Sequence, residues 1–190
     1  MLKKLVAVMI VVCCASAARG EIAKGQVFLS LGGGASLPMS DFGDEAEAGY
    51  HYGASFGFWL SPQIAIGGEV NYHKYEFPTA LQTPGVDANW SIVQVTAFGK
   101  YLLTYASTAP YVKYALGLYK HKESGAFTSS FSESKLGIGV GLGVQFSGIG
   151  KVGGFAEAMY HNIFIDDIFA DGGDLNFINL SGGILIKLGG

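Results

Sequence analysis

The chain has 190 residues, a usual length for one domain. It contains 29 glycines, 49% hydrophobic residues and only 14% charged residues, with a formal net charge of −3. A soluble protein usually carries more surface charge than this, and an acidic balance argues against a surface that binds nucleic acid.

The first predicted element is an N-terminal export signal. The segment MLKKLVAVMIVVCCASA has two lysines near its start, Lys3 and Lys4, continues as an apolar run to Cys14 and ends on small residues. This order is typical of a secretory signal peptide, and the apolar run is too short to span a bilayer. We therefore predict a signal peptide over residues 1–20 and a mature domain over residues 21–190.

Removal of the signal peptide changes the charge and the cysteine count. It leaves nine lysines against fifteen acidic residues, a net charge of −6, and no cysteine. The mature chain therefore has no disulfide and no thiolate metal site. A lipoprotein that begins at Cys13 or Cys14 is the less favoured alternative, because Val12 is bulkier than such processing tolerates.

The mature chain shows a hydrophobic period of two and no long helical period, which indicates strands throughout. Most of the predicted strands are longer than usual globular strands and match the length of tilted membrane strands. The sequence predicts eight strands, at residues 26–37, 49–60, 63–77, 90–103, 110–121, 134–146, 151–164 and 175–188.

The predicted connections alternate between short turns and long polar loops. This alternation is typical of an outer-membrane barrel, which has an even number of strands and short turns on the periplasmic side. The short connections are 61–62, 104–109 and 147–150, and the long ones are 38–48, 78–89, 122–133 and 165–174.

Each predicted strand has one apolar face and one face of small or polar residues. In the segment 136–146, glycine occupies positions 137, 139, 141 and 143 of one face, while large apolar residues occupy the other. We predict that the apolar face meets lipid and that the small face lines a narrow, filled lumen, where the glycines leave room for large side chains from across the barrel. A soluble lipocalin-like binder, with the apolar face inside, is the alternative.

Aromatic residues on the predicted lipid-facing side gather towards both strand ends. Such residues are typical of the two girdles of a membrane barrel. They are Tyr50, Tyr52, Tyr72, Tyr160 and Phe164 at the loop end, and Tyr101 and Phe146 at the turn end.

The chain resembles the small eight-stranded outer-membrane barrels of the OmpA/OmpX type, the outer membrane protein β-barrel domain family. The signal peptide, the strands PYVKYALGLY and GFAEAMYHNI, and the closing strand NLSGGILIKL carry this resemblance. It implies an all-β, antiparallel up-and-down transmembrane barrel in the cell outer membrane, with outer-membrane lipid and the outer-membrane assembly machinery as partners. The family usually ends on an aromatic residue, whereas this chain ends Leu188-Gly189-Gly190.

Five ionisable residues are predicted to face the lumen. Because a lone buried charge is costly, they are expected to form ion pairs. Barrels that this chain resembles have an internal ionic cluster that plugs or gates the lumen. One hypothesis pairs Glu69 and Glu157 with Lys100 and Lys113 to block water, and the other is a packing network without gating. The predicted cluster is Glu69, Glu157, Lys100, Lys113 and Lys187.

The long loops are strongly acidic, with twelve carboxylates against four lysines. Clustered carboxylates suit hard divalent cations, so one loop is a candidate cation site. The alternative is a solvated acidic rim that keeps the protein monomeric, and no EF-hand spacing is present. The candidate residues are Asp166, Asp167, Asp171 and Asp174.

No catalytic motif, resident metal or cofactor is predicted. His161 follows Glu157 by four residues, but the neighbours of His161 supply no nucleophile. The histidines at positions 51, 73, 121 and 161 are expected to be rim residues near the loop end of the strands. We predict a non-enzymatic protein with a role in envelope integrity or in surface interaction. The alternatives are a narrow channel or carrier for small solutes and, by resemblance, a barrel enzyme that modifies lipid A.

Overall fold

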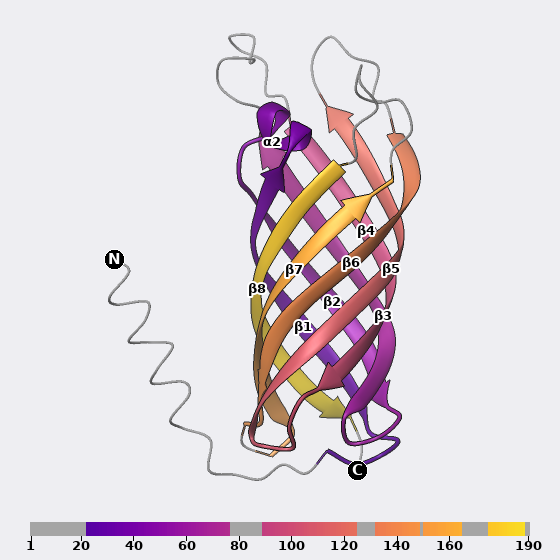
Figure 1. Ribbon diagram of the computed structural model, residues 1–190, viewed down its shortest axis with the longest axis vertical. Helices are drawn as coiled ribbons and strands as arrows, with labels where there is room; N and C mark the ends of the chain where they lie inside the picture. Colours follow the sequence, from indigo (N-terminus) through magenta and orange to yellow (C-terminus); the bar gives the residue numbers. More distant parts are fainter. Residues whose placement is uncertain (1–21, 77–88, 125–131, 149, 165–174, 189–190) are drawn as a thin grey trace, which may run out of the picture.

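The computed structural model describes residues 22–76, 89–124, 132–148, 150–164 and 175–188. In this part of the chain, eight antiparallel strands close into one barrel in chain order (Figure 1). The predicted signal peptide lies outside the described residues. The strands are β1 (Val27–Met39), β2 (Gly49–Trp59), β3 (Ile64–Glu76), β4 (Asn89–Leu102), β5 (Thr108–Ser124), β6 (Ser132–Phe146), β7 (Val152–Ile163) and β8 (Leu175–Leu188).

The first and last strands close the barrel. β1 pairs with β8 from Val27 opposite Leu188 to Met39 opposite Asn176, so neither strand leaves an open edge. A closed sheet pairs its backbone polar groups internally, as a bilayer requires. The predicted all-β fold with eight up-and-down strands is therefore confirmed. No helix among the described residues has the length and hydropathy to span a membrane.

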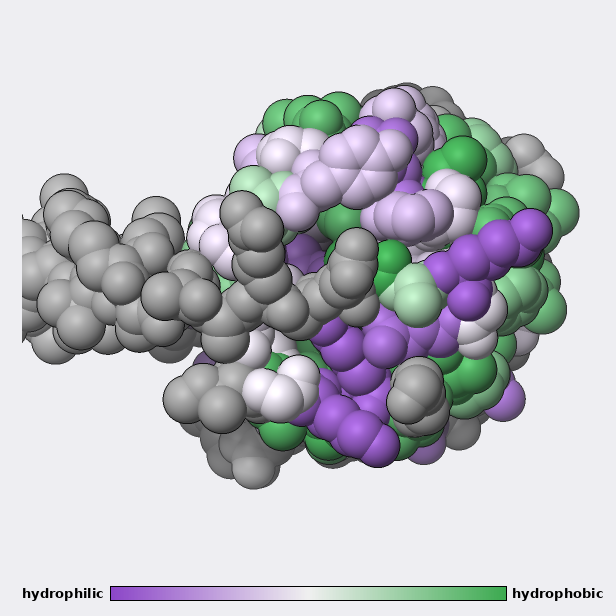
Figure 2. All heavy atoms as spheres, turned by 90° about the horizontal axis from the view of Figure 1, so that it is seen from below, coloured by the Kyte–Doolittle hydropathy of each residue, from purple (hydrophilic) through white to green (hydrophobic). Residues whose placement is uncertain are grey.

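The two faces of the sheet have the predicted orientation. Leu142 and Leu116 are exposed on the outside, at 64% and 57% of their surface, whereas Trp59, Tyr111 and Phe177 are buried inside. Seen from the turn end, hydrophobic residues surround a more hydrophilic centre (Figure 2). This orientation overturns the lipocalin-like alternative, which needs the apolar face inside.

The glycines of β6 make room for side chains of the two neighbouring strands. A Cβ at Gly137 would lie 2.7 Å from the ring of Tyr119, and one at Gly143 would overlap the ring of Tyr111. Both tyrosines belong to β5, which pairs with β6, and Tyr111 is the direct partner of Gly143. The expectation that these side chains come from across the barrel is wrong, because the nearest inward side chains extend sideways along the wall.

One element inside a predicted loop was missed. The short helix α2 (Asp41–Glu45) lies at the loop end of the barrel and places Phe42 in the lumen, fully buried (Figure 1). The Phe42 ring contacts Tyr75 edge-on, with centroids 5.0 Å apart, and lies 6.1 Å from Trp90. Five residues with an internal glycine give no hydrophobic period, so the sequence does not indicate this helix.

Two apolar clusters fill the lumen, one towards each end. The turn-end cluster is centred on Phe28, Trp59, Phe98 and Tyr111. The loop-end cluster includes Phe42, Tyr75, Trp90, Tyr119 and Phe177. A polar layer lies between them, and it contains the buried ionisable side chains described next.

Candidate functional site

An ionic triad forms the centre of the polar layer. Lys113 on β5 lies between two carboxylates, with its Nζ 2.7 Å from Oε2 of Glu69 on β3 and 3.1 Å from Oε1 of Glu157 on β7. The side chains of all three residues are almost completely buried. The ammonium group of Lys113 on β5 therefore links β3 and β7, which lie two strands away from β5 on either side.

The carboxylate oxygens of the triad also accept neutral hydrogen bonds. Oε1 of Glu69 accepts from Nε2 of Gln94 and from Oγ1 of Thr96, each at 3.0 Å. Oε2 of Glu157 accepts from the hydroxyl of Tyr111 at 2.9 Å. Such additional bonds offset the cost of removing charges from water, which ion pairing alone often does not.

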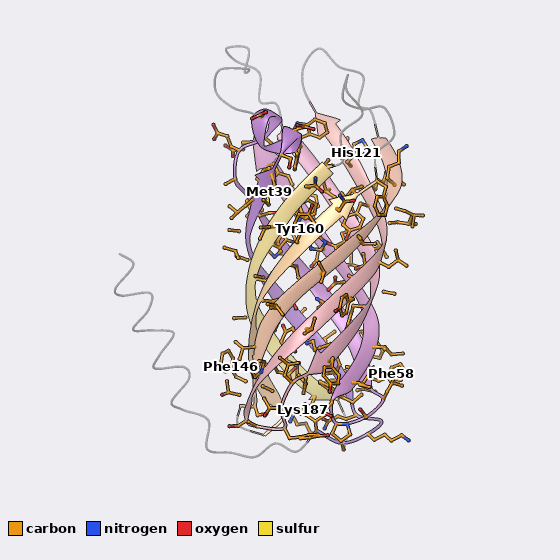
Figure 3. All side chains as sticks on the ribbon, in the orientation of Figure 1. Met39, Phe58, His121, Phe146, Tyr160 and Lys187 are labelled. Carbon is orange, nitrogen blue, oxygen red and sulfur yellow. The ribbon has the colours of Figure 1, made fainter. Side chains whose placement is uncertain are left out.

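Two of the five predicted lumen residues lie outside this triad. The ammonium of Lys100 lies over the Tyr111 ring, 4.4 Å from its centroid, a cation–π arrangement. Lys187 lies near the turn end (Figure 3). It is six residues beyond Ser181, the strand partner of Glu157, and therefore roughly 20 Å further along β8. The expected pairing of the glutamates with Lys100 is wrong, because both ion pairs of the described residues belong to Lys113 and Lys100 lies over the Tyr111 ring instead.

Gln94 connects the triad to buried histidines. Its Nε2 faces Glu69, and its Oε1 lies 3.1 Å from Nε2 of His73. A carboxylate only accepts and an amide oxygen only accepts, so Gln94 donates to Glu69 and His73 donates to Gln94. His73 thus carries its proton on Nε2, and its Nδ1 lies 3.5 Å from Oγ of Ser36.

Ser36 extends the network towards the loop end. Its hydroxyl donates to Oδ1 of Asn179 at 2.7 Å and lies 2.5 Å from the hydroxyl of Tyr75. Nδ2 of Asn179 donates to Nε2 of His161 at 3.2 Å, and Nδ1 of His161 lies 2.9 Å from the hydroxyl of Tyr119. A continuous chain of polar contacts therefore runs from Tyr75 to Tyr111, between the two apolar clusters.

The four histidines are not rim residues, contrary to expectation. His51, His73, His121 and His161 are each at most 5% exposed. They occupy inward positions of their strands, and the rings of His73 and His161 pack against Phe177 of the loop-end cluster, with centroid distances of 5.1 Å and 4.8 Å. The period of two indicates correctly that the histidines face the lumen, but it does not show that they are buried below the rim.

The described residues form two serine–histidine contacts in the lumen, the Ser36–His73 contact given above and a shorter one. Nε2 of His51 lies 2.8 Å from Oγ of Ser181. A catalytic triad would need a carboxylate on the other nitrogen, and Nδ1 of His51 bonds to no carboxylate of the described residues. The adjoining cavity, lined by Ser181, His51, Glu69 and Glu157, has a volume of about 50 Å³. This space holds a few water molecules and no lipid or peptide.

No group of three or more potential metal ligands (His, Cys, Asp or Glu) occurs among the described residues. The candidate cation loop with Asp166, Asp167, Asp171 and Asp174 lies outside the part of the chain that the structure describes.

Sequence reasoning missed the neutral members of the network. Ser36, Tyr75, Gln94, Thr96 and Asn179 all occupy inward positions, which the period of two does indicate. Which of these side chains touch one another depends on the stagger between neighbouring strands. The alternation along a single strand gives no information about that stagger.

The sequence and the fold both match known outer-membrane barrels. The family model described as the outer membrane protein β-barrel domain matches residues 5–185. The structure of Neisserial surface protein A (NspA) is similar, with 19% identity over 85% of this chain and 97% of that chain, and a TM-score of 0.64. The N-terminal barrel domain of Pseudomonas aeruginosa OprF has 12% identity over 87% and 98%, with a TM-score of 0.55. Ail, the attachment invasion locus protein of Yersinia pestis, has 19% identity over 86% and 99%, with a TM-score of 0.51. No curated protein matches the chain by sequence.

The solved structures establish the fold, and the family model covers nearly the whole chain. The closed barrel with its apolar exterior agrees with both. The chain therefore belongs to the outer membrane protein β-barrel domain family and is a transmembrane β-barrel of the cell outer membrane.

Proposed function

We propose that this protein is a non-enzymatic, monomeric barrel with a sealed lumen, which contributes to envelope integrity and presents its acidic loops for surface interaction. The observation that carries the proposal is the filled interior. Two largely aromatic clusters enclose the Glu69–Lys113–Glu157 triad, and the cavity beside the triad has a volume of about 50 Å³. An eight-stranded barrel is just wide enough for side chains to fill it.

Conductance across a planar bilayer tests the sealed lumen. We expect the purified barrel to give no steady single-channel steps, with a large porin in the same bilayers as the control for insertion. Reproducible steps from the wild-type protein would instead support the second candidate function, a narrow channel for small solutes. The observation that favours this candidate is the charged layer itself, because rearrangement of its ion pairs would open a polar path.

A role in the envelope is tested by deletion of the gene. We expect greater sensitivity to detergent and to large antibiotics, and restoration by the wild-type gene. The surface role draws on the similar protein Ail, whose name describes attachment and invasion and which was solved with the heparin analogue sucrose octasulfate. Unchanged sensitivity together with unchanged surface binding of the deletion strain would contradict this proposal.

A further inference from the structure

Three lysines gather on the outside of the barrel at its loop end. Lys74 lies near the end of β3, and Lys120 and Lys122 lie near the end of β5. Lys74 is opposite Ser91 of β4, and Ser91 is in turn opposite Lys122. Strand spacing places the backbone of Lys74 and that of Lys122 roughly 10 Å apart, and Lys120 and Lys122 are roughly 7 Å apart along β5.

The lysines begin where the lipid-facing apolar surface ends. On β3, the outward positions change from Val70 and Tyr72 to Lys74. On β5, they change from Leu116 and Leu118 to Lys120 and Lys122. The three ammonium groups therefore lie at the border between acyl chains and headgroups, which long lysine side chains reach by extending towards water.

Tyrosines continue the same rows of the sheet. Tyr50 is the partner of Lys74, and Tyr52 is the partner of Tyr72. The exposed rings of Tyr50 and Tyr52 and the half-buried ring of Tyr72 form one group, with centroid distances of 6.5 Å from Tyr50 to Tyr52 and 5.5 Å from Tyr52 to Tyr72. Lipid-facing tyrosines are typical of the headgroup level of a membrane.

None of the three lysines forms an ion pair with a carboxylate in the described part of the chain, where both ion pairs belong to Lys113. Of the described lysines on the outside, the other two, Lys24 and Lys151, lie beside the turn end of the barrel. An acidic protein thus concentrates three lysines at one place on its outer rim, where the exposed Glu76 is the next outward residue of β3 after Lys74.

We propose that Lys74, Lys120 and Lys122 bind the phosphate groups of a phosphorylated glycolipid of the outer leaflet. The ammonium groups neutralise the phosphates. The acyl chains lie over Val93, Val95 and Leu118, directly below on the same wall. The tyrosine group borders the headgroup on the β2 side. This proposal rests on the membrane orientation of the barrel and not on the sealed lumen.

Binding of lipid A to the folded barrel in detergent tests the proposal. The probes are bis-phosphorylated lipid A, the same lipid without phosphates, and inorganic phosphate. Native mass spectrometry measures the lipid that each barrel retains. The test variant is Lys74→Gln/Lys120→Gln/Lys122→Gln, and the matched control is Lys24→Gln/Lys151→Gln, which removes two exposed lysines at the turn end.

We expect the triple variant to bind bis-phosphorylated lipid A about 100-fold more weakly, since each lysine near an anionic lipid surface contributes about fivefold. The control variant and the variant with arginine at all three positions keep the wild-type affinity. Lipid A without phosphates binds the wild type and the triple variant equally weakly. Heat-modifiable migration on a gel verifies that each variant is folded.

Three results would overturn the proposal. These are equal binding of bis-phosphorylated lipid A by the wild type and the triple variant, an equal loss in the turn-end control, or equally tight binding of both lipids by the wild type. Displacement of the lipid by millimolar inorganic phosphate would assign the site to free phosphate and would also overturn it. The conductance measurement is independent of these results, so failure of this site is distinguishable from failure of the sealed lumen.

Discussion

Gln94 donates a hydrogen bond from its Nε2 to Oε1 of Glu69 over 3.0 Å. The same amide accepts from His73 through its oxygen. One side chain therefore links the charged triad to the neutral histidine network. Both functions of the amide are used, and the site around it is buried. This arrangement makes Gln94 the residue whose loss would disconnect the polar layer.

Replacement of Gln94 by leucine tests this connection. Gln94→Leu leaves a donor of His73 unpaired and removes one donor from Glu69, so the free energy of unfolding should fall by about 2–4 kcal/mol. Urea unfolding in lipid vesicles, followed by tryptophan fluorescence, measures the change. Gln63→Leu is the control, because Gln63 is only half-buried at the turn end, where water can replace its hydrogen bonds, and its replacement should cost less than about 1 kcal/mol. Equal losses in the two variants would contradict the connecting role.

Replacement of Lys113 by methionine tests the triad. Lys113→Met leaves two buried carboxylates without their cation, and removal of one partner of a buried pair costs about 3–5 kcal/mol. The combination Glu69→Gln/Lys113→Met/Glu157→Gln should recover most of this loss, because no buried charge of the triad remains. The same unfolding measurement applies. A triple variant no more stable than Lys113→Met would contradict this and would show that the lost ion pairs themselves, and not the unpaired charges, account for the destabilisation.

Alanine at Gly143 tests the close approach of β5 and β6. The new Cβ would overlap the Tyr111 ring, which the hydrogen bond to Glu157 holds in place. Overpacking of this kind costs about 1–3 kcal/mol. Gly99→Ala is the matched control, because a Cβ at Gly99 would have no neighbouring atom within 4 Å. In the Gly143→Ala background, Tyr111→Leu should restore part of the lost free energy of unfolding. If the effects of the two substitutions on this free energy simply add, residue 143 and the Tyr111 ring are not in contact.

Removal of the Phe42 ring tests the cover formed by α2. Phe42→Ala should destabilise the loop-end cluster by about 3–5 kcal/mol and admit water to Trp90. The measurement is a red shift of Trp90 fluorescence in a Trp59→Phe background, which leaves Trp90 as the only tryptophan. An unshifted spectrum with unchanged stability would mean that α2 does not cover the lumen. Met39→Ala, on the outside of β1, is the control (Figure 3).

The eight strands and their faces were predictable from the sequence. The last strand was predicted at residues 175–188, as observed, and the predicted start of β5 differs by two residues. This success has a physical cause. In a membrane barrel every strand separates lipid from a filled lumen, so each strand carries the same alternation of apolar and small or polar residues.

The inward positions of Glu69, Lys113 and Glu157 and the pairing of Lys113 with both glutamates were likewise predictable, but the position of Lys100 outside these ion pairs was not. Lys100 is one strand away from Lys113 and directly opposite it in the register, yet only Lys113 bridges the glutamates. The difference depends on the Tyr111 ring, which lies beside Lys100 and occupies the space above the β6 glycines. The fold of α2 over the mouth depends in the same way on a tertiary contact, the packing of Phe42 against Tyr75.

The sequence by itself determined the number of strands, their order, and which side chains meet lipid, because these follow from a local period of two. Only the tertiary structure decided which buried groups touch, at what depth the histidines lie and which lysines share one patch of the outer rim. Barrel closure sets the stagger between strands, and this stagger brings together residues whose separation in the chain carries no periodic signal.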